Sequence, residues 1–156
     1  MRKRQDLVID GALSETNPIF TMTVDSFTDV HIDFSRMSYI NSIGVKNWMI
    51  WIYKIPSSSQ IFLHQCPFVI INQSVIVTGF LSKNSFLMSF QAPYYCEFCH
   101  EEKYHLLQRG KDYEYPLDGG ASRISIPEVL PCTRCSRSMM PDFVFDKTFL
   151  FLNGID

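Results

Sequence analysis

The chain has 156 residues, of which 46% are hydrophobic and 19% are charged. This composition is typical of a globular protein with one ordinary domain or two small ones. The formal net charge is only −2, which argues against a generic binder of nucleic acid or of anionic membranes. The longest run of large apolar residues, Trp48 to Tyr53, covers six positions. A membrane-spanning helix needs about 20, so we expect none.

The N-terminal segment begins with Met1-Arg2-Lys3-Arg4, as a secretory signal peptide does. Polar residues then follow, where a signal peptide would have its apolar segment. We therefore expect the protein to stay in the cytoplasm, where thiols are kept reduced.

The first 91 residues alternate between strand-like and helix-like segments. Their periodicity predicts strands at 7–9, 19–24, 30–34, 61–63 and 86–90. It also predicts a helix from Ile43 to Ile55, with Ser42 as its N-cap and Pro56 as its stop. A second helix is expected from Pro67 to about Thr78, because proline suits the first helical position. This order of elements predicts an α/β fold in which helices pack on a sheet.

The first predicted helix is apolar on almost every side. Its core-facing side carries Val45, Trp48, Met49 and Ile52. Ile50 and Trp51 then fall on either side of the narrow polar arc, and a helix of this kind is expected to be covered all round. The sheet covers one side only, so Ile50 and Trp51 should meet the C-terminal segment, a second copy of the chain or a regulatory partner. We favour an intermolecular contact.

From Ala92 onward helical periodicity disappears, and four of the five cysteines fall in two Cys-x-x-Cys pairs. The pairs comprise Cys96, Cys99, Cys132 and Cys135. In a cytoplasmic chain such pairs indicate metal ligands rather than disulfides. Four thiolates complete the tetrahedral shell of a structural zinc ion and leave no position open for a substrate. We place a domain boundary here, giving a first domain at 1–91 and a second at 92–156.

The second segment resembles a zinc ribbon over Tyr94 to Leu152. The resemblance implies a small β-rich domain, with one hairpin at 104–115 and strands within 142–152. Zinc ribbons often carry glycine after the second cysteine of each pair, whereas this chain has His100 and Ser136. Both the number and the spacing of the cysteines still match the ribbon.

The cysteines allow other interpretations, which the sequence favours less. Cys96-Glu97-Phe98-Cys99-His100 has the form of a c-type haem attachment motif, but that chemistry needs export and leaves the second pair unexplained. A thioredoxin-like pair would stand at the start of a helix after a strand, and neither pair does. His100 and His105 could compete as zinc ligands, although four cysteines already fill the shell. Two pairs with identical internal spacing argue against unrelated free thiols.

The segment Val30–Gly44 reads VHIDFSRMSYINSIG and resembles the core of a STAS domain. This family includes the bacterial anti-sigma-factor antagonists and the tails of sulfate transporters. Asp33-Phe34-Ser35 matches the end of the family's strand, and Ile40–Gly44 matches the loop before its helix. The resemblance covers residues 7–91 and implies a STAS-like sheet with packed helices, followed here by the zinc ribbon.

In the antagonists, the serine that opens this helix is phosphorylated by a partner kinase, and Ser42 matches that serine. Asn41 stands where the antagonists usually carry aspartate, and Ile43 replaces a small residue. The resemblance implies a non-enzymatic bacterial regulatory module whose partner is a kinase or an anti-sigma-like factor. Asn41 lies in the matching loop, and a partner that touches this loop could also reach Ile50 and Trp51 on the helix, so we expect these three residues to be contact residues. A role of Ser42 as a helix cap alone stays open.

Two other functions are alternatives to this one. A nucleic-acid-binding zinc ribbon could use Arg123, Arg134 and Arg137 on phosphates, with Tyr94 and Tyr95 stacking on bases. The net charge makes this alternative less favoured. A thiol-dependent enzyme would depend on Cys66 alone, because no Ser-His-Asp arrangement, phosphate-binding loop or paired-carboxylate motif can be recognised in the sequence.

Overall fold

The computed structural model describes residues 1–117 and 120–153 and has a mixed α/β fold, as predicted. Its elements, where η marks a 3-10 helix, are β1 (Lys3–Leu13), η1 (Pro18–Thr21), β2 (Thr28–Ile40), α1 (Ser42–Ile52), β3 (Gln60–His64), α2 (Phe68–Ile76), β4 (Ser85–Leu87), β5 (Ser89–Tyr95), β6 (Glu102–Gln108), β7 (Tyr113–Glu114), β8 (Arg123–Ile124), β9 (Leu130–Pro131), β10 (Ser138–Pro141), α3 (Phe145–Thr148) and η2 (Leu150–Asn153). Within the described ranges no helix is both long and apolar enough to cross a membrane.

The first sheet has the order β1-β2-β3-β4, and all of its strands are parallel. Parallel neighbours need crossover connections, which are almost always right-handed. Since the order follows the chain, the crossovers all pass over the same face. Successive side chains of a strand point to opposite faces. Ile32 and Phe34 are buried, and Phe34 packs against Trp48 of α1, while His31 and Asp33 lie on the opposite, partly exposed face.

Helix α1 begins one residue earlier than predicted. Asn41 has extended backbone angles, and its side chain accepts a hydrogen bond of 2.7 Å from the backbone N–H of Gly44. Asparagine is among the preferred N-cap residues for this reason. Ser42 is already helical, so the expectation that Ser42 caps the helix is wrong.

Both tryptophans of α1 are buried, and each indole N–H finds a backbone partner. Trp48 donates to the carbonyl oxygen of Phe80 at 2.9 Å, and Trp51 donates to that of Met22 at 2.9 Å. Trp51 is only 4% exposed, whereas Ile50 is 49% exposed. The chain itself thus covers Trp51, which corrects the expectation that Trp51 lies on a partner-binding surface.

The cover over Trp51 comes from the segment around η1, where a strand was predicted at 19–24. Asn17 caps η1 by accepting a hydrogen bond of 3.0 Å from the N–H of Ile19, and Pro18 follows at the first helical position. The buried Asn17 amide also donates to the carbonyl oxygens of Asp10 and Ala12. These capping interactions favour a 3-10 turn over the strand that the alternating side chains suggested.

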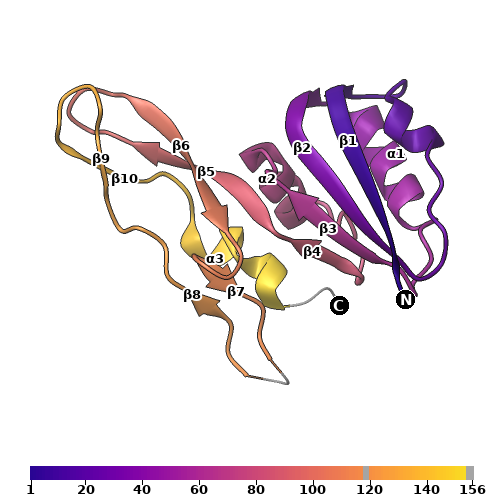
Figure 1. Ribbon diagram of the computed structural model, residues 1–156. Coiled ribbons are helices and arrows are strands. Elements are labelled where there is room, and N and C mark those ends of the chain that lie inside the picture. The colour runs from indigo at the N-terminus through magenta and orange to yellow at the C-terminus, as the bar shows by residue number, and fades with distance from the viewer. Residues whose placement is uncertain (118–119, 154–156) are drawn as a thin grey trace.

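The second sheet, of order β6-β5-β10-β9, is antiparallel and lies beside the first (Figure 1). The strand predicted at 86–90 is divided at Met88 into two strands, β4 and β5. Strand β5 runs through the domain boundary expected between residues 91 and 92. The two parts of the chain also share one hydrophobic cluster.

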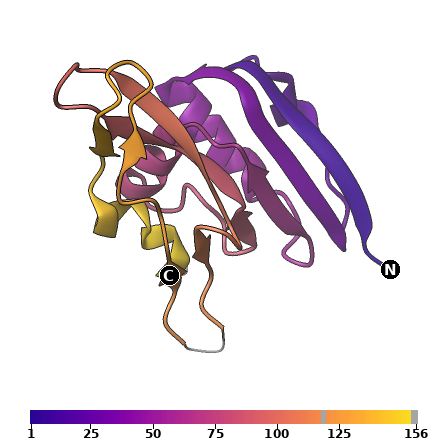
Figure 2. The same ribbon diagram turned by 60° about the vertical axis from the view of Figure 1, so that its left-hand side comes forward.

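The C-terminal segment folds back onto the first part of the chain, with α3 next to α2 (Figure 2). Strands were expected within 142–152, but the structure has α3 and η2 there. Phe149 and Phe151 each lie 5.9 Å from Phe90 between ring centroids, and both contact Tyr113. Burial of these rings around Phe90 outweighs the strand-like alternation of the segment.

Candidate metal centre

The four paired cysteines lie in two tight turns. Cys96 and Cys99 occupy the turn between β5 and β6, and Cys132 and Cys135 occupy the turn between β9 and β10. Strand β5 pairs with both β6 and β10. This pairing brings the two turns side by side although 32 residues separate them in sequence.

Both turns have the same backbone hydrogen bonds. In the first, the N–H of Cys96 donates to Glu101 at 2.9 Å, and the N–H of His100 donates back to Cys96 at 2.9 Å. The second turn repeats this pattern with Cys132, Arg137 and Ser136, at 2.7 and 2.9 Å. Equal spacing in the sequence therefore produces equal local geometry, which we call the two knuckles.

The residue after each second cysteine adopts a left-handed backbone. The φ angle is 64° at His100 and 65° at Ser136, where glycine is the residue without a steric cost. A side chain in this conformation costs roughly 1–2 kcal/mol. His100 also bonds through Nδ1 to the hydroxyl of Tyr95 at 2.5 Å. The absence of glycine thus leaves the knuckle geometry intact.

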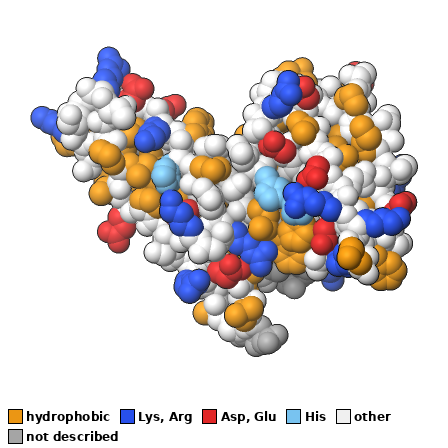
Figure 3. Space-filling model, viewed as in Figure 1, with side chains coloured by type: hydrophobic (Ala, Val, Ile, Leu, Met, Phe, Trp, Pro, Cys, Tyr) orange, Lys and Arg blue, Asp and Glu red, His pale blue; other side chains and the backbone are white. Residues whose placement is uncertain are grey.

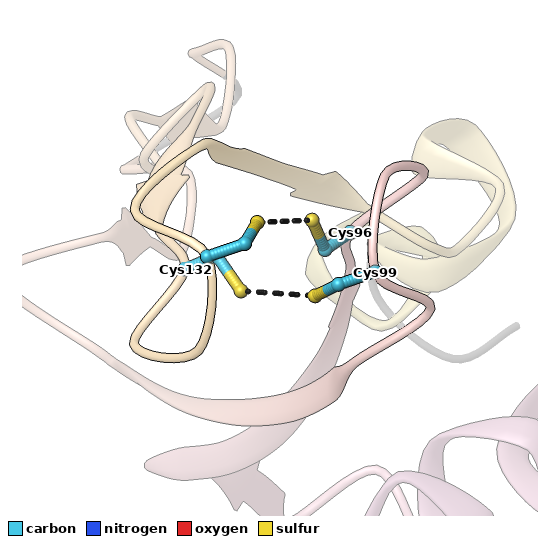
Figure 4. Close-up of side chains that lie close together, drawn as sticks. Cys96, Cys99 and Cys132 are labelled. Carbon is cyan, nitrogen blue, oxygen red and sulfur yellow. Dashed lines mark hydrogen bonds between the residues drawn. The ribbon is translucent and has the colours of Figure 1, made fainter.

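The four sulfur atoms all lie within 4.8 Å of one another. The Sγ atoms of Cys96 and Cys135 are 3.5 Å apart, as are those of Cys99 and Cys132 (Figure 4). These distances exceed a disulfide bond of about 2.05 Å. They approach the edge of about 3.8 Å in a tetrahedron with metal–sulfur bonds of about 2.3 Å. The cluster therefore fits a single metal ion with four sulfur ligands.

The knuckle backbone favours the thiolate form of the first cysteine in each pair. The backbone N–H of Cys99 is the main cause that lowers the pKa of Cys96 to about 7. The N–H of Cys135 likewise lowers the pKa of Cys132. Burial, together with the neighbouring thiols, raises the pKa of Cys99 to about 12. A cation among the sulfurs would favour deprotonation of all four, because the thiolate is the form that binds metal.

The two candidate histidine ligands lie apart from the sulfur cluster. His100 is bonded to Tyr95, and the ring of His105 packs edge-on against Tyr94. Within residues 1–117 and 120–153, the cysteines are the only group of three or more metal-ligating side chains that converge. Tetrahedral sulfur ligation suits zinc or iron.

The residues expected to bind nucleic acid do not form a common surface of free side chains. Tyr94 is fully buried, and its hydroxyl donates to the carbonyl oxygen of Pro127 at 2.7 Å. Tyr94 therefore cannot stack on a base, and this part of the alternative is wrong. Arg134 pairs with Glu101 at 3.4 Å, Arg137 lies over the Phe98 ring at 4.2 Å, and Arg123 stands opposite Glu114 in the β7–β8 register. Tyr95 is half-buried.

Cys66 is fully buried, and burial raises the pKa of its thiol well above the ordinary value. A protonated thiol without access to solvent is a poor nucleophile. The structure therefore gives no support to a thiol-dependent enzyme centred on Cys66.

The other candidate region lies at the start of α1. Asn41, Ser42 and Ile43 are all exposed there, and Gly44 is buried behind them. The Asn41 side chain is engaged in capping, as described above, which leaves the Ser42 hydroxyl on the surface of the first helical turn. Asn41 and Ser42 thus share the exposed start of α1, and Ile50 lies two turns further along the same helix.

Comparisons with protein-family models, with curated proteins and with solved structures give no match.

Proposed function

We propose that the chain is a non-enzymatic regulatory module that acts by binding another protein and contains one structural zinc ion. The four-sulfur cluster supports the structural role, because a shell filled by four cysteines has no position for a substrate. Zinc suits the cluster because four tetrahedral thiolates are the donor set of its structural sites.

The module would be of the STAS type and would work in the bacterial cytoplasm. Support comes from the local order of elements: β2 leads through the loop at Asn41 into α1, and β3, α2 and β4 follow. This is the order in which the resembling segments occur in that family. The partner would be a kinase or an anti-sigma-like factor.

The observation that carries the proposal is the exposure of Ser42 on the first turn of α1. Its sequence neighbours Tyr39 and Ile43 are 57% and 45% exposed, so apolar side chains near Ser42 are available to a partner. Backbone N–H groups and the helix dipole stabilise a phosphate at such an end. A phosphate would add a charge of about −1.5 to −2 next to these side chains and weaken a partner docked there.

The proposal is tested by capturing the partner with wild-type protein, Ser42→Asp and Ser57→Asp. Ser57 is an exposed loop serine that follows α1, so its variant controls for added charge. We expect Ser42→Asp alone to lose the partner, and we expect phosphopeptide mapping of native protein to show modified Ser42. Full capture by Ser42→Asp, together with unmodified Ser42, would contradict the proposal.

A further inference from the structure

Helix α1 has one side that the described chain leaves uncovered. Six residues on the helix or directly after it are exposed, and at 3.6 residues per turn they fall within about one third of the helix circumference. Two isoleucines lie along the middle of this side, two turns apart, and one lysine lies on each flank. We call the six residues the α1 strip; they are Ser42, Ile43, Lys46, Ile50, Tyr53 and Lys54.

The two lysines of the α1 strip have no carboxylate partner. Neither Lys46 nor Lys54 is in an ion pair within residues 1–117 and 120–153. The sequence contains no aspartate or glutamate between Asp33 and Glu97, so neither α1 nor α2 supplies an acidic group. The positive charge of the strip is therefore not neutralised from within its own part of the chain.

The segments that flank α1 add no acidic group either. Segment 18–24, which accepts the hydrogen bond of Trp51 at Met22, is uncharged, and segment 77–83, which accepts that of Trp48, contains only Lys83. Hollows of about 270 and 510 Å³ lie between these segments and the end of α1, and Lys54 lines both. The α1 strip and its surroundings thus form an apolar surface whose charges are all positive.

The charges of the strands are arranged differently. Figure 3 shows the face of the sheet opposite α1, where basic and acidic side chains lie next to each other around histidine side chains. Nδ1 of His31 and Nε2 of His64 are hydrogen-bonded to each other there at 2.8 Å. Every basic residue before Asn41 has an acidic partner: the pairs are Arg2 with Asp29, Lys3 with Asp25, Arg4 with Asp6, and Arg36 with Asp10. Of the remaining acids in this part of the chain, Asp33 lies on the face opposite α1 and Glu15 precedes η1.

We infer that the α1 strip binds an acidic amphipathic helix of the partner protein, whose apolar side chains cover Ile43 and Ile50 and whose carboxylates pair with Lys46 and Lys54. This inference rests on the proposed function, because it gives the chemistry of the protein that the module binds. The two isoleucines are seven residues apart, the spacing at which apolar positions recur along two packed helices. Lysines on both flanks favour a helix with glutamate or aspartate beside its apolar positions.

An anionic membrane fits the α1 strip less well than an acidic helix does. A helix that lies in a membrane interface needs a large apolar face, whereas the apolar side chains of the strip are two isoleucines and Tyr53. A lysine near an anionic membrane contributes only about 1 kcal/mol. Two flanking lysines therefore give little affinity for a membrane, but they can discriminate between acidic and basic helices.

The test uses two fluorescent peptides of three heptads, about 21 residues each, with leucine at the core positions. One peptide has glutamate at the flanking positions and the other has lysine. Fluorescence anisotropy should show at least about 10-fold tighter binding of the glutamate peptide, with a preference that weakens as salt is added. The backbone amide signals of α1 should shift in NMR spectra when the glutamate peptide binds.

The double variant Lys46→Glu/Lys54→Glu should reverse this preference, because carboxylates then flank the isoleucines. Lys103→Glu/Lys111→Glu is the matched control: it changes the net charge equally at two exposed lysines outside the α1 strip, and it should keep the preference of wild-type protein. Should the first double variant fail to fold, Ile50→Ser takes its place and should weaken binding of the glutamate peptide by about 10-fold or more.

Three results would overturn the inference. Wild-type protein may bind the two peptides equally or bind neither, the control may lose the preference as the strip variant does, or the protein may bind only vesicles of phosphatidylcholine with phosphatidylserine, which would indicate a membrane. Peptide binding requires no modification of Ser42. Its failure would therefore leave the proposed function standing, which the capture experiment with Ser42→Asp tests separately.

Discussion

The backbone of Gly44 lies directly against the carbonyl group of Leu13, so that a Cβ atom on Gly44 would overlap the Leu13 carbonyl oxygen. This contact joins the first turn of α1 to the end of β1, two elements separated by the whole of β2. Only glycine allows so close an approach. The contact also fixes the position of the neighbouring Asn41 and Ser42 relative to the sheet.

Gly44→Ala should destabilise the fold by about 3 kcal/mol or more, at the upper end of overpacking effects, because the obstacle is backbone and cannot move aside. Urea unfolding measures the change. Lys46→Ala, an exposed change in the same helix, should shift stability by no more than about 0.5 kcal/mol. Equal stability of Gly44→Ala and wild-type protein would show that the helix and strand are further apart than described.

Cys132→Ser should abolish metal binding and unfold the knuckles. Apparent zinc affinities of small domains correspond to about 10–16 kcal/mol, more than the second sheet could replace by packing alone. Elemental analysis should show one zinc per chain in wild-type protein and none in the variant. Cys66→Ala should keep its zinc, because Cys66 lies apart from the cluster. Wild-type protein that lacks zinc after purification without chelator would rule out the site.

Ser136→Gly should stabilise the second knuckle by about 1 kcal/mol, because glycine has no steric cost at a φ of 65°. Competition with a chromophoric chelator should show tighter zinc retention. His100→Gly should stabilise the first knuckle less, since this change also removes the hydrogen bond to Tyr95. Weaker zinc retention by Ser136→Gly than by wild-type protein would mean that the serine side chain makes a compensating contact.

Trp51→Ala should lower the free energy of unfolding by about 3–5 kcal/mol, as expected for a buried tryptophan, and leave the molar mass unchanged. Ile50→Ser, on the exposed side of α1, should change stability by no more than about 0.5 kcal/mol. Urea unfolding and light scattering together distinguish a residue buried within one chain from a residue that lies between two copies of the chain. A stable Trp51→Ala variant with a reduced molar mass would place Trp51 between copies of the chain.

Stability should fall on mild acidification, in part because of His31 and His64. Burial lowers the pKa of both rings below the ordinary value of 6.5; Arg4 lowers that of His31 further, and His31 lowers that of His64. The unfolded chain then binds more protons, so the stabilisation is complete above pH 6.5 and is lost as the pH falls through the lowered values. Unfolding free energies at pH 7.5 and 5.5, without added metal, should differ less in the His31→Gln/His64→Gln variant. Equal differences in both proteins would refute this origin.

The metal centre could be predicted because its information is local. The spacing of Cys96 and Cys99, repeated at Cys132 and Cys135, is sufficient to indicate ligands, and the structure confirms that the four converge and could hold a metal ion. The mixed α/β fold could be predicted for the same reason, from periodicity within short windows. Both predictions are confirmed at this level of detail.

Features that depend on tertiary contacts could not be predicted from the sequence alone. The helical wheel showed that Trp51 needs a cover, but only the path of the chain around Met22 shows that this cover is intramolecular. His31 and His64 meet because β2 and β3 pair in one particular register, which no local pattern specifies. At Phe149 and Phe151, packing around Phe90 overrides the alternation that suggested a strand.

The aromatic cluster around Phe90 has a consequence for biosynthesis. Phe90 and Tyr113 leave the ribosome well before Phe149 and Phe151, the rings that complete their burial. Domains generally fold from the N-terminus while the chain is still growing, but here α2 and β5 keep an open apolar side until residues 149–151 emerge. The core is thus complete only after residues 149–151 have been synthesised. A nascent chain stalled before Phe149 would be a natural target for chaperones.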